Sequence, residues 1–171
     1  MKRINENFFK LSANELAPKL LGKILCRRFD DGSVRKARII ETECYMGEID
    51  SASHAYKGKT ERNKIMFERG GVAYVYLCYG IHFLFNIVSG EAGSPEGVLI
   101  RGVEGAVGPG NVTRYFGIDK TFYGEDLKIS NILWIEDDGA QPQINYKKRI
   151  GINYAKEIDQ NRLWRFIAKD I

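Results

Sequence analysis

Two glutamates and a tyrosine alternate along the stretch ARIIETECYMGEID, residues 37–50. The two isoleucines that precede them are β-branched, and such residues favour strands. Because side chains alternate across a strand, Glu41, Glu43 and Tyr45 would all point to the same face. Two carboxylates on one face repel each other unless water, a cation or a chemical task keeps them there. This spacing therefore marks candidates for acid–base chemistry.

One arginine and one histidine extend this set of candidates. Arg101 lies among apolar residues in VLIRGV, where a charge needs a carboxylate partner, and Glu41 or Glu43 would serve. On spacing alone, a structural ion pair is as good an interpretation as a functional one. A metal site would recruit both glutamates, Asp50 and His54. The region offers no second nearby histidine and no helical His–Glu spacing, so we expect no metal.

The segment LCYGIH joins two strand-like runs, VAYVYLCY and IHFLFNIV. Gly80 at the junction favours a β-hairpin with Tyr79 at its tip. A tip tyrosine either folds back on neighbouring loops or lies on the surface, or it projects as a wedge suited to a base stack. Tyr74 and Tyr76, on the first of the two strands, are by default sheet-packing residues.

The polar loop KGKTERNK carries three lysines and an arginine against a single acid. Such a run is usually a solvated surface. Because this one lies between the carboxylate strand and the aromatic hairpin, it is also suited to gripping phosphates beside a reactive pocket. The candidates for contact with a nucleic-acid backbone are Lys59, Thr60, Arg62 and Asn63.

The elements that must position these residues are predicted from capping and turn signals. Ser12 and Glu15 form a capping-box pattern at the start of a short helix, and Asp31-Gly32 marks a hairpin turn. GPGNVTRYFGI is typical of a helix, whereas LKISNILWIEDDG and KKRIGINYA favour strands. The predicted fold is α+β (mixed α/β): a single domain over residues 1–171, with a curved, mainly antiparallel sheet, peripheral helices and a protruding β-hairpin.

Composition limits the classes of protein to consider. The 171 residues are 44% hydrophobic and 28% charged, which is typical of a soluble globular domain. The net charge of +4 permits an acidic partner without requiring one, and no apolar run approaches the roughly 20 residues of a membrane span. Three cysteines without C-x-x-C spacing indicate free thiols in a reducing compartment. We therefore expect a cytoplasmic location.

Several consecutive motifs resemble the alkyladenine (3-methyladenine, or methylpurine) DNA glycosylase family. They are ARIIETECYMG, SHAYKGKTERNKIMFERGGVAYVYLCYGIHFLFNIVS and EGVLIRGVE, followed by GPGNVTRYFGID and RIGINYAKE…LWRFI. The resemblance implies a single-domain DNA repair enzyme without a cofactor or metal. Such an enzyme flips an alkylated or deaminated purine out of double-stranded DNA and hydrolyses its N-glycosidic bond, leaving an abasic site. A DNA-scanning protein of this size is expected to be a monomer, associated with the nucleoid if the source is bacterial.

The resemblance also implies roles for the reacting groups. Glu43 matches the general base that activates the attacking water, and Arg101 matches the arginine that helps to hold this water. Glu41 is then structural. No lysine nucleophile is needed, so we expect hydrolysis without strand cleavage.

The substrate contacts follow from the same resemblance. Tyr45, His54 and Tyr76 match the residues that sandwich the extruded base, and Asn86 matches an asparagine lining the pocket. Tyr79 matches the tyrosine that enters the minor groove and fills the gap left by the flipped nucleotide.

The sequence departs from the family pattern after Glu104. A charged helical stretch is expected there, but GAVGPG follows almost at once, so this element is deleted. The next motif reads VTRYFGI instead of a sequence like LCQALGI. Because these changes bear on DNA affinity, the alternative is a damaged-DNA-binding protein that does not cut. A metal-dependent hydrolase is a third interpretation, which predicts inhibition by chelators.

Overall fold

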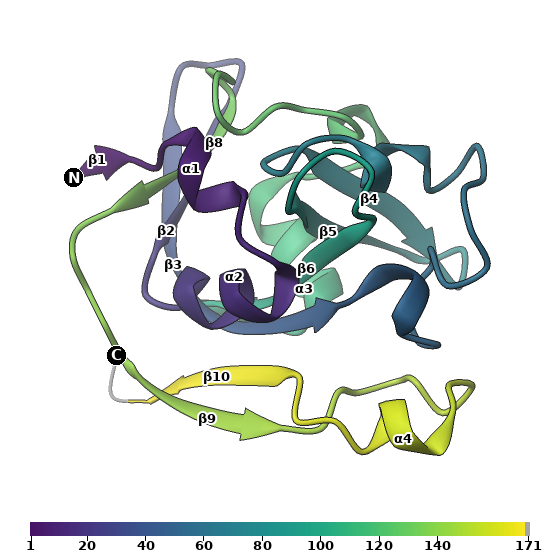
Figure 1. Ribbon diagram of the computed structural model, residues 1–171. Coiled ribbons are helices and arrows are strands. Elements are labelled where there is room, and N and C mark those ends of the chain that lie inside the picture. Colours follow the sequence, from purple (N-terminus) through teal and green to yellow (C-terminus); the bar gives the residue numbers. More distant parts are fainter. Residues whose placement is uncertain (170–171) are drawn as a thin grey trace.

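The alternating apolar segments fold as strands of one antiparallel sheet, seen in the computed structural model that describes residues 1–169 (Figure 1). The strand order is β1-β8-β2-β3-β6-β5-β4, with β7 paired to β6, and β10 paired to both β3 and β9. The strands are β1 (Lys2–Arg3), β2 (Ile24–Arg28), β3 (Val34–Tyr45), β4 (Ala73–Cys78), β5 (His82–Ser89), β6 (Glu96–Val103), β7 (Ala106–Val107), β8 (Leu133–Asp137), β9 (Gln143–Lys147) and β10 (Arg165–Lys169).

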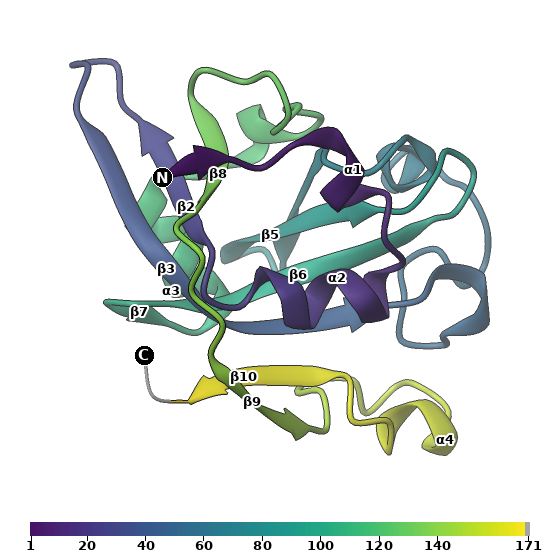
Figure 2. The same ribbon diagram turned by 60° about the vertical axis from the view of Figure 1, so that its left-hand side comes forward.

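The long strand β3 joins the two halves of the sheet. Its first part pairs with β2, and its second part pairs with β10 on one side and β6 on the other. The register between β3 and β6 shifts on both sides of Glu41, as at a β-bulge, which bends a strand and re-aims its side chains. Figures 1 and 2 show β9 and β10 as an antiparallel pair joined through a long connection that contains a short helix, and β10 pairs with one edge of β3. The predicted carboxylate strand therefore lies between two strands.

Helices cover the two faces of the sheet. Helix α2 lies in front of β3 and β6, and α3 lies behind them (Figures 1 and 2). The predicted capping box of α2 is confirmed, because the Ser12 backbone N–H donates to Glu15 Oε2 at 3.2 Å. Leu16 and Leu20 of α2 and Phe116 of α3 are fully buried, and each such side chain contributes about 1.5–3 kcal/mol. The helices are α1 (Glu6–Phe9), α2 (Ala13–Leu20), α3 (Pro109–Phe116) and α4 (Glu157–Gln160), with 3₁₀ helices at Gly47–Ile49, Lys64–Phe67 and Lys120–Phe122.

A tight turn replaces the element that is missing after Glu104. Val103 pairs directly with Ala106, so Glu104 and Gly105 alone connect β6 to β7. Gly105 has a φ of +84°, which glycine adopts without a steric penalty. The chain thus passes from β6 to α3 by a short hairpin.

The α+β class and the antiparallel sheet are confirmed, but one predicted strand is wrong. KKRIGINYA was expected to be extended and paired, whereas β9 ends at Lys147 and the next residues form no strand. The Ile150 backbone N–H, which a strand pairing would use, donates instead to the Glu43 carboxylate. Among residues 1–169, no helix is both long enough and apolar enough to cross a membrane.

Candidate active site

Glu43 lies in the second half of β3 and is fully buried. Both of its carboxylate oxygens accept hydrogen bonds. The Ile150 backbone N–H donates to Oε1 at 2.9 Å, and the Tyr45 hydroxyl donates to Oε2 at 2.8 Å. The bond to Tyr45 confirms that these two β3 side chains share one face of the strand.

Arg101, on β6, faces both glutamates. Its Nε donates to Glu41 Oε1 at 3.3 Å and lies 3.6 Å from Glu43 Oε1. Glu41 also accepts a hydrogen bond from Arg165 Nη1, on β10, at 3.0 Å. Glu41 is thus held between two arginines, which supports its structural role and leaves Glu43 with the more distant contact to Arg101.

Burial and nearby cations act in opposite directions on Glu43. Desolvation raises the pKa of Glu43 above its ordinary value, while Arg101, the Ile150 amide, the Tyr45 hydroxyl and Arg149 oppose that rise. A carboxylate whose pKa is raised by burial, and which is still held by donors, is suited to accepting a proton. Three carboxylates and three guanidinium groups form ion pairs around it. Arg101 pairs with Glu41 and Glu43, Arg165 pairs with Glu41, and Arg149 pairs with Asp50.

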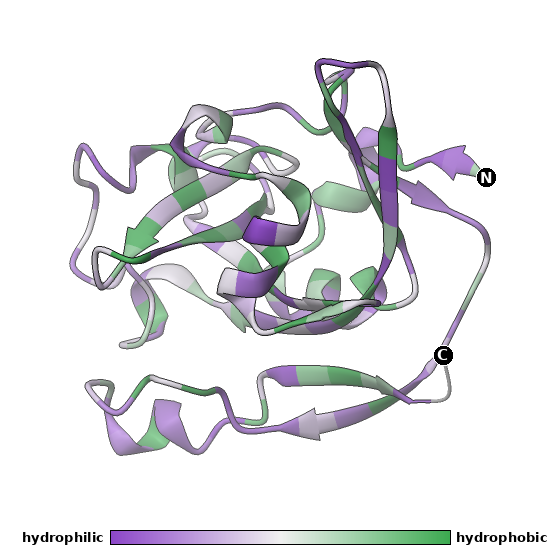
Figure 3. Cartoon of the chain, turned by 180° about the vertical axis from the view of Figure 1, so that it is seen from behind, coloured by the Kyte–Doolittle hydropathy of each residue, from purple (hydrophilic) through white to green (hydrophobic). Residues whose placement is uncertain are grey.

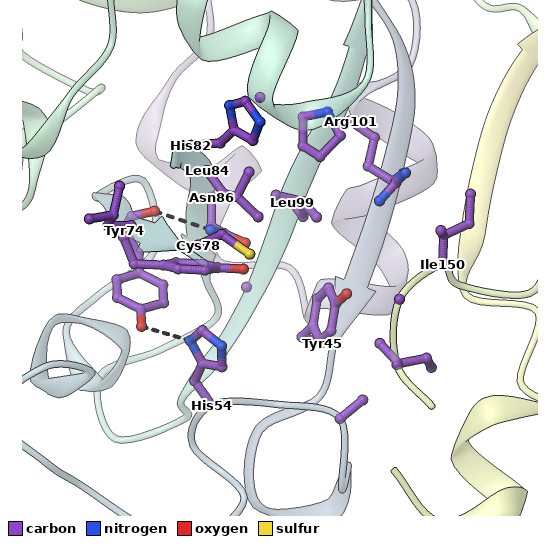
Figure 4. A pocket seen from close by; sticks show the side chains of 18 of the residues that line it. Tyr45, His54, Tyr74, Cys78, His82, Leu84, Asn86, Leu99, Arg101 and Ile150 are labelled. Atoms are coloured by element: carbon purple, nitrogen blue, oxygen red, sulfur yellow. Dashed lines mark hydrogen bonds between the residues drawn. The ribbon is translucent and has the colours of Figure 1, made fainter. Parts of the chain in front are cut away.

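A cavity of about 640 Å³ lies beside Glu43. Tyr45, Arg101 and Ile150, which all contact the buried carboxylate, are among the residues that line it. Figure 4 shows Tyr45 near the Ile150 segment, with His54 and Tyr74 grouped together away from it. The volume falls within the range of about 300–1,000 Å³ for small-molecule sites.

An aromatic cluster forms another wall of the cavity. The ring centroids of His54 and Tyr76 lie 4.5 Å apart, and those of Tyr74 and Tyr76 lie 5.3 Å apart. His54 Nδ1 is 2.9 Å from the Tyr74 hydroxyl oxygen. Desolvation, and then the charge of Arg62, lower the pKa of His54 to about 4, so the ring is neutral at physiological pH. Tyr45, His54 and Tyr76 thus line one cavity, although they come from β3, a loop and β4.

Asn86, on β5, also lines the cavity and is nearly buried. Its Nδ2 donates to the Tyr74 backbone carbonyl at 3.2 Å, across the pairing of β4 with β5 (Figure 4). This bond fixes the orientation of the amide. Asn86 is therefore a rigid polar group in a largely aromatic and aliphatic site.

The hairpin of β4 and β5 carries Tyr79 at its tip, as predicted. Cys78 pairs with His82, and the connection contains Tyr79 and Gly80, which both have positive φ angles, of 50° and 66°. The Tyr79 side chain is 88% exposed. Figure 3 shows that β4 ends in hydrophobic residues where it reaches this tip. The tip is therefore an exposed apolar projection at the mouth of the cavity, which Tyr79 also lines.

The basic loop divides into exposed residues and one buried residue. Lys59, Thr60 and Arg62 are exposed, and the Arg62 guanidinium lies 5.2 Å from the centre of the Tyr76 ring. Asn63 is only 2% exposed, which contradicts its predicted position on the DNA-contacting surface. Its side chain accepts from the Thr60 N–H at 2.7 Å and donates to the carbonyls of His54 and Gly58, both at 2.9 Å. Asn63 therefore organises the loop from within.

Sequence reasoning missed the residues that follow β9. Arg149 forms a buried, bidentate ion pair with Asp50, at 2.6 and 2.8 Å, and Ile150 supplies the amide for Glu43. Tyr154 lines the cavity, and its hydroxyl donates to the Ala52 carbonyl at 2.7 Å. RIGINYA was part of a motif that resembles the family, but an arginine beside an isoleucine also suits an ordinary strand and assigned no role to these residues.

The four groups considered for a metal are separated by their own partners. Glu41 and Glu43 face Arg101, Asp50 pairs with Arg149, and His54 contacts Tyr74. Within residues 1–169, no group of three or more His, Cys, Asp and Glu side chains has an arrangement that could hold a metal ion.

Comparison with known proteins gives one consistent match. The sequence model of the family described as "Methylpurine-DNA glycosylase (MPG)" matches residues 7–107 and 104–171. These two stretches meet at the β6–β7 turn, where the chain departs from the expected pattern.

Similar curated proteins carry the name "Putative 3-methyladenine DNA glycosylase". One from Borrelia garinii subsp. bavariensis is 43% identical over 176 residues, covering 95% of this chain and 94% of that protein. One from Clostridium botulinum is 40% identical over 196 residues, covering 98% of this chain and 96% of that protein. One from Psychrobacter cryohalolentis is 39% identical over 196 residues, covering 98% and 92%. All three alignments exceed the 171 residues of this chain, so each of these relatives contains residues that it lacks. The site and these matches agree: the chain belongs to the methylpurine-DNA glycosylase family.

Proposed function

We propose that this protein is a DNA repair glycosylase that hydrolyses the N-glycosidic bond of alkylated or deaminated purines in double-stranded DNA. The observation that carries the proposal is a buried carboxylate, Glu43, held by Arg101, Tyr45 and the Ile150 amide beside an aromatic-lined cavity. Membership of the methylpurine-DNA glycosylase family and the names of the relatives support the same substrate class.

In the proposed mechanism, Glu43 is the general base. The C–N bond breaks through a sugar with oxocarbenium character, which a nearby carboxylate stabilises while it accepts a proton from the attacking water. Arg101, 3.6 Å from Glu43, orients the same water. A single carboxylate suffices for an alkylated purine, because its positive charge makes the base a good leaving group.

Water must reach Glu43 for this chemistry, although the carboxylate has no contact with solvent in the free protein. The Tyr45 hydroxyl occupies Oε2, and Tyr45 also lines the cavity in which the base would stack. We infer that stacking of the base shifts the Tyr45 hydroxyl and frees this oxygen for water. Binding of the substrate would then complete the catalytic group.

The aromatic wall suits a purine that carries a positive charge. Tyr45, Tyr76 and a neutral His54 offer aromatic faces to the base, and base–aromatic stacking is worth roughly 1–3 kcal/mol. The fixed amide of Asn86 lies where it would discriminate among purines of different shape.

Contacts outside the cavity would grip the duplex. Tyr79 fills the gap left by the flipped nucleotide, and the exposed Lys59, Thr60 and Arg62 lie close to the DNA backbone. Among the residues described, no lysine lines the cavity, which favours simple hydrolysis over a lyase step through a Schiff base. Such an enzyme acts on DNA as a monomer. In a bacterium it would be found in the cytoplasm, at the nucleoid.

One observation favours the alternative of a non-catalytic damage-binding protein: Glu43 is sealed from solvent. A single experiment separates the two functions. Single-turnover release of the base is measured in chelator, from duplexes that carry one alkylated purine, hypoxanthine or ethenoadenine, with the native chain and Glu43→Gln. We expect the native chain to release at least one of these bases, and the variant to bind the same duplex without releasing it. Tight binding without release by either chain would establish the binding protein instead.

A further inference from the structure

Arg149 joins three segments that surround Glu43. Its side chain is fully buried and makes a bidentate pair with Asp50, at 2.6 and 2.8 Å. Nη1 also donates to the Cys44 carbonyl at 3.0 Å, and Nη2 donates to the Asp159 carbonyl at 3.3 Å. One guanidinium thus links β3, the loop after β3 and helix α4.

The position of Arg149 in the chain couples it to the carboxylate. Cys44 directly follows Glu43, and Ile150, whose N–H bonds to Glu43 Oε1, directly follows Arg149. The guanidinium carbon also lies 4.8 Å from the centre of the Tyr45 ring. Fixing Arg149 therefore fixes both the donor to Oε1 and the ring whose hydroxyl bonds Oε2.

No regular pairing performs this task. Pairing of β10 with β3 covers Arg165 to Ile167, and β9 ends at Lys147, so the chain around Ile150 belongs to no strand. Asp50 is itself held, because its oxygens accept from the backbone N–H groups of Met46 and Ala52, each at 3.1 Å. A buried ion pair is weak evidence for stability, since apolar residues of similar volume often stabilise a fold as well. They would not, however, fix the direction of the Ile150 amide.

We propose that Arg149, with Asp50 as its counter-ion, is a positioning residue that holds the Ile150 amide and the Tyr45 ring against Glu43. The inference rests on the proposed glycosylase function and deepens it. Arg149 acts through its neighbours, and the reacting groups remain Glu43 and Arg101.

The pH dependence of the reaction would report this role. The charged or titratable groups that face Glu43 are Tyr45 and, through the shared Arg101, Glu41 from its own strand, Arg101 from β6, and Arg149 and Tyr154 from the segment after β9. An N–H donor to a carboxylate favours its ionised form. Loss of the Ile150 donor would therefore move the acid limb of the rate profile to higher pH, which a general loss of packing would not do.

Ile150→Pro removes the N–H donor itself, and Ile150→Ala is the matched control because it truncates the side chain but keeps the amide. Arg149→Lys keeps the charge but cannot form the bidentate contact. For each chain, folding is checked by thermal unfolding, and single-turnover base release and duplex affinity are measured across pH. Where proline prevents folding, an ester in place of the Arg149–Ile150 peptide bond removes the same N–H.

We expect Ile150→Pro and Arg149→Lys to lose about 100-fold in rate, the typical effect of a 1 Å misplacement, with the acid limb shifted upward. Duplex affinity should change less than about threefold, and Ile150→Ala, which keeps the amide, should keep the acid limb of the native profile. Native rates and profiles in folded Arg149→Lys and in the proline or ester chain would overturn the positioning role while leaving the glycosylase intact. Failure of the native chain to release any base would overturn both.

Discussion

Replacing Tyr79 at the strained tip of the β4–β5 hairpin should have opposite effects on the stability of the fold and on the affinity for DNA. Tyr79 has a φ of 50°, in the left-handed region, which costs a non-glycine residue about 1–2 kcal/mol. With the side chain 88% exposed, little burial offsets this cost in the free protein. Tyr79→Gly would relieve the strain, against about 0.5–1 kcal/mol for the larger backbone entropy that glycine loses on folding. The fold should therefore be unchanged or more stable by up to about 1.5 kcal/mol.

The same substitution should weaken recognition of DNA. Removing an aromatic stack costs roughly 1–3 kcal/mol, which corresponds to about a 5- to 150-fold loss of affinity. Binding is measured by fluorescence anisotropy with a lesion duplex, in the Glu43→Gln background so that no base is released. Stability is measured by urea unfolding of the same chains. Tyr79→Phe is the control, because it keeps the ring and the backbone strain.

Either measurement could refute this reasoning. Equal duplex affinity in Tyr79→Gly and Tyr79→Phe would show that the ring does not enter the stack. A loss of more than about 1 kcal/mol of stability in the glycine variant would show that the exposed ring packs on the protein after all. Backbone strain at Tyr79 that brings no structural benefit is expected if DNA binding requires this conformation.

Three further predictions concern the site and the elements that support it. Burial raises the pKa of Glu43, so the rate of base release should fall as the pH drops through that raised value. The buried ionised carboxylate opposes folding, so Glu43→Gln should melt at a higher temperature than the native chain at pH 7. A lower melting temperature for Glu43→Gln would contradict the direction of the pKa shift. Asn63→Ala removes three hydrogen bonds inside the basic loop and should lower the free energy of unfolding in urea by about 2–4 kcal/mol. A loss under about 0.5 kcal/mol would contradict the role of Asn63 in organising the loop. Tyr154→Phe removes the donor to the Ala52 carbonyl and should cost about 1 kcal/mol of stability by the same measurement, and a variant as stable as the native chain would show that this bond is not formed in solution.

Local patterns predicted the parts of the site that lie on regular structure. Alternation along β3 placed Glu43 and Tyr45 on one face, and Gly80 placed Tyr79 at a hairpin tip, because strand geometry and turn conformation depend on neighbouring residues. The resemblance to a family then assigned roles that spacing alone left open. The α+β class followed from the same strand and turn signals.

Long-range partners could not be predicted in this way. The environment of Arg149 depends on Asp50, 99 positions away, and nothing within RIGINYA distinguishes an anchor from a strand residue. Asn63 sits in a polar, charged loop, so its burial depends on carbonyl groups that only the folded loop presents. The bulge near Glu41 likewise arises from the pairing of β3 with β6 and leaves no mark in the composition of either strand.

The position of β10 against β3 has a consequence for the order in which the chain folds. Glu43 and the amide that bonds to it are 107 positions apart, so a growing chain makes the carboxylate strand long before the segment that covers it. Until β10 arrives, the edge of β3 that carries Glu41 to Glu43 is unpaired, and closing such distant contacts is slow. A nascent chain would therefore acquire activity in one late step. Conversely, mild denaturant that releases the paired strands β9 and β10 should abolish activity while the rest of the sheet is still folded.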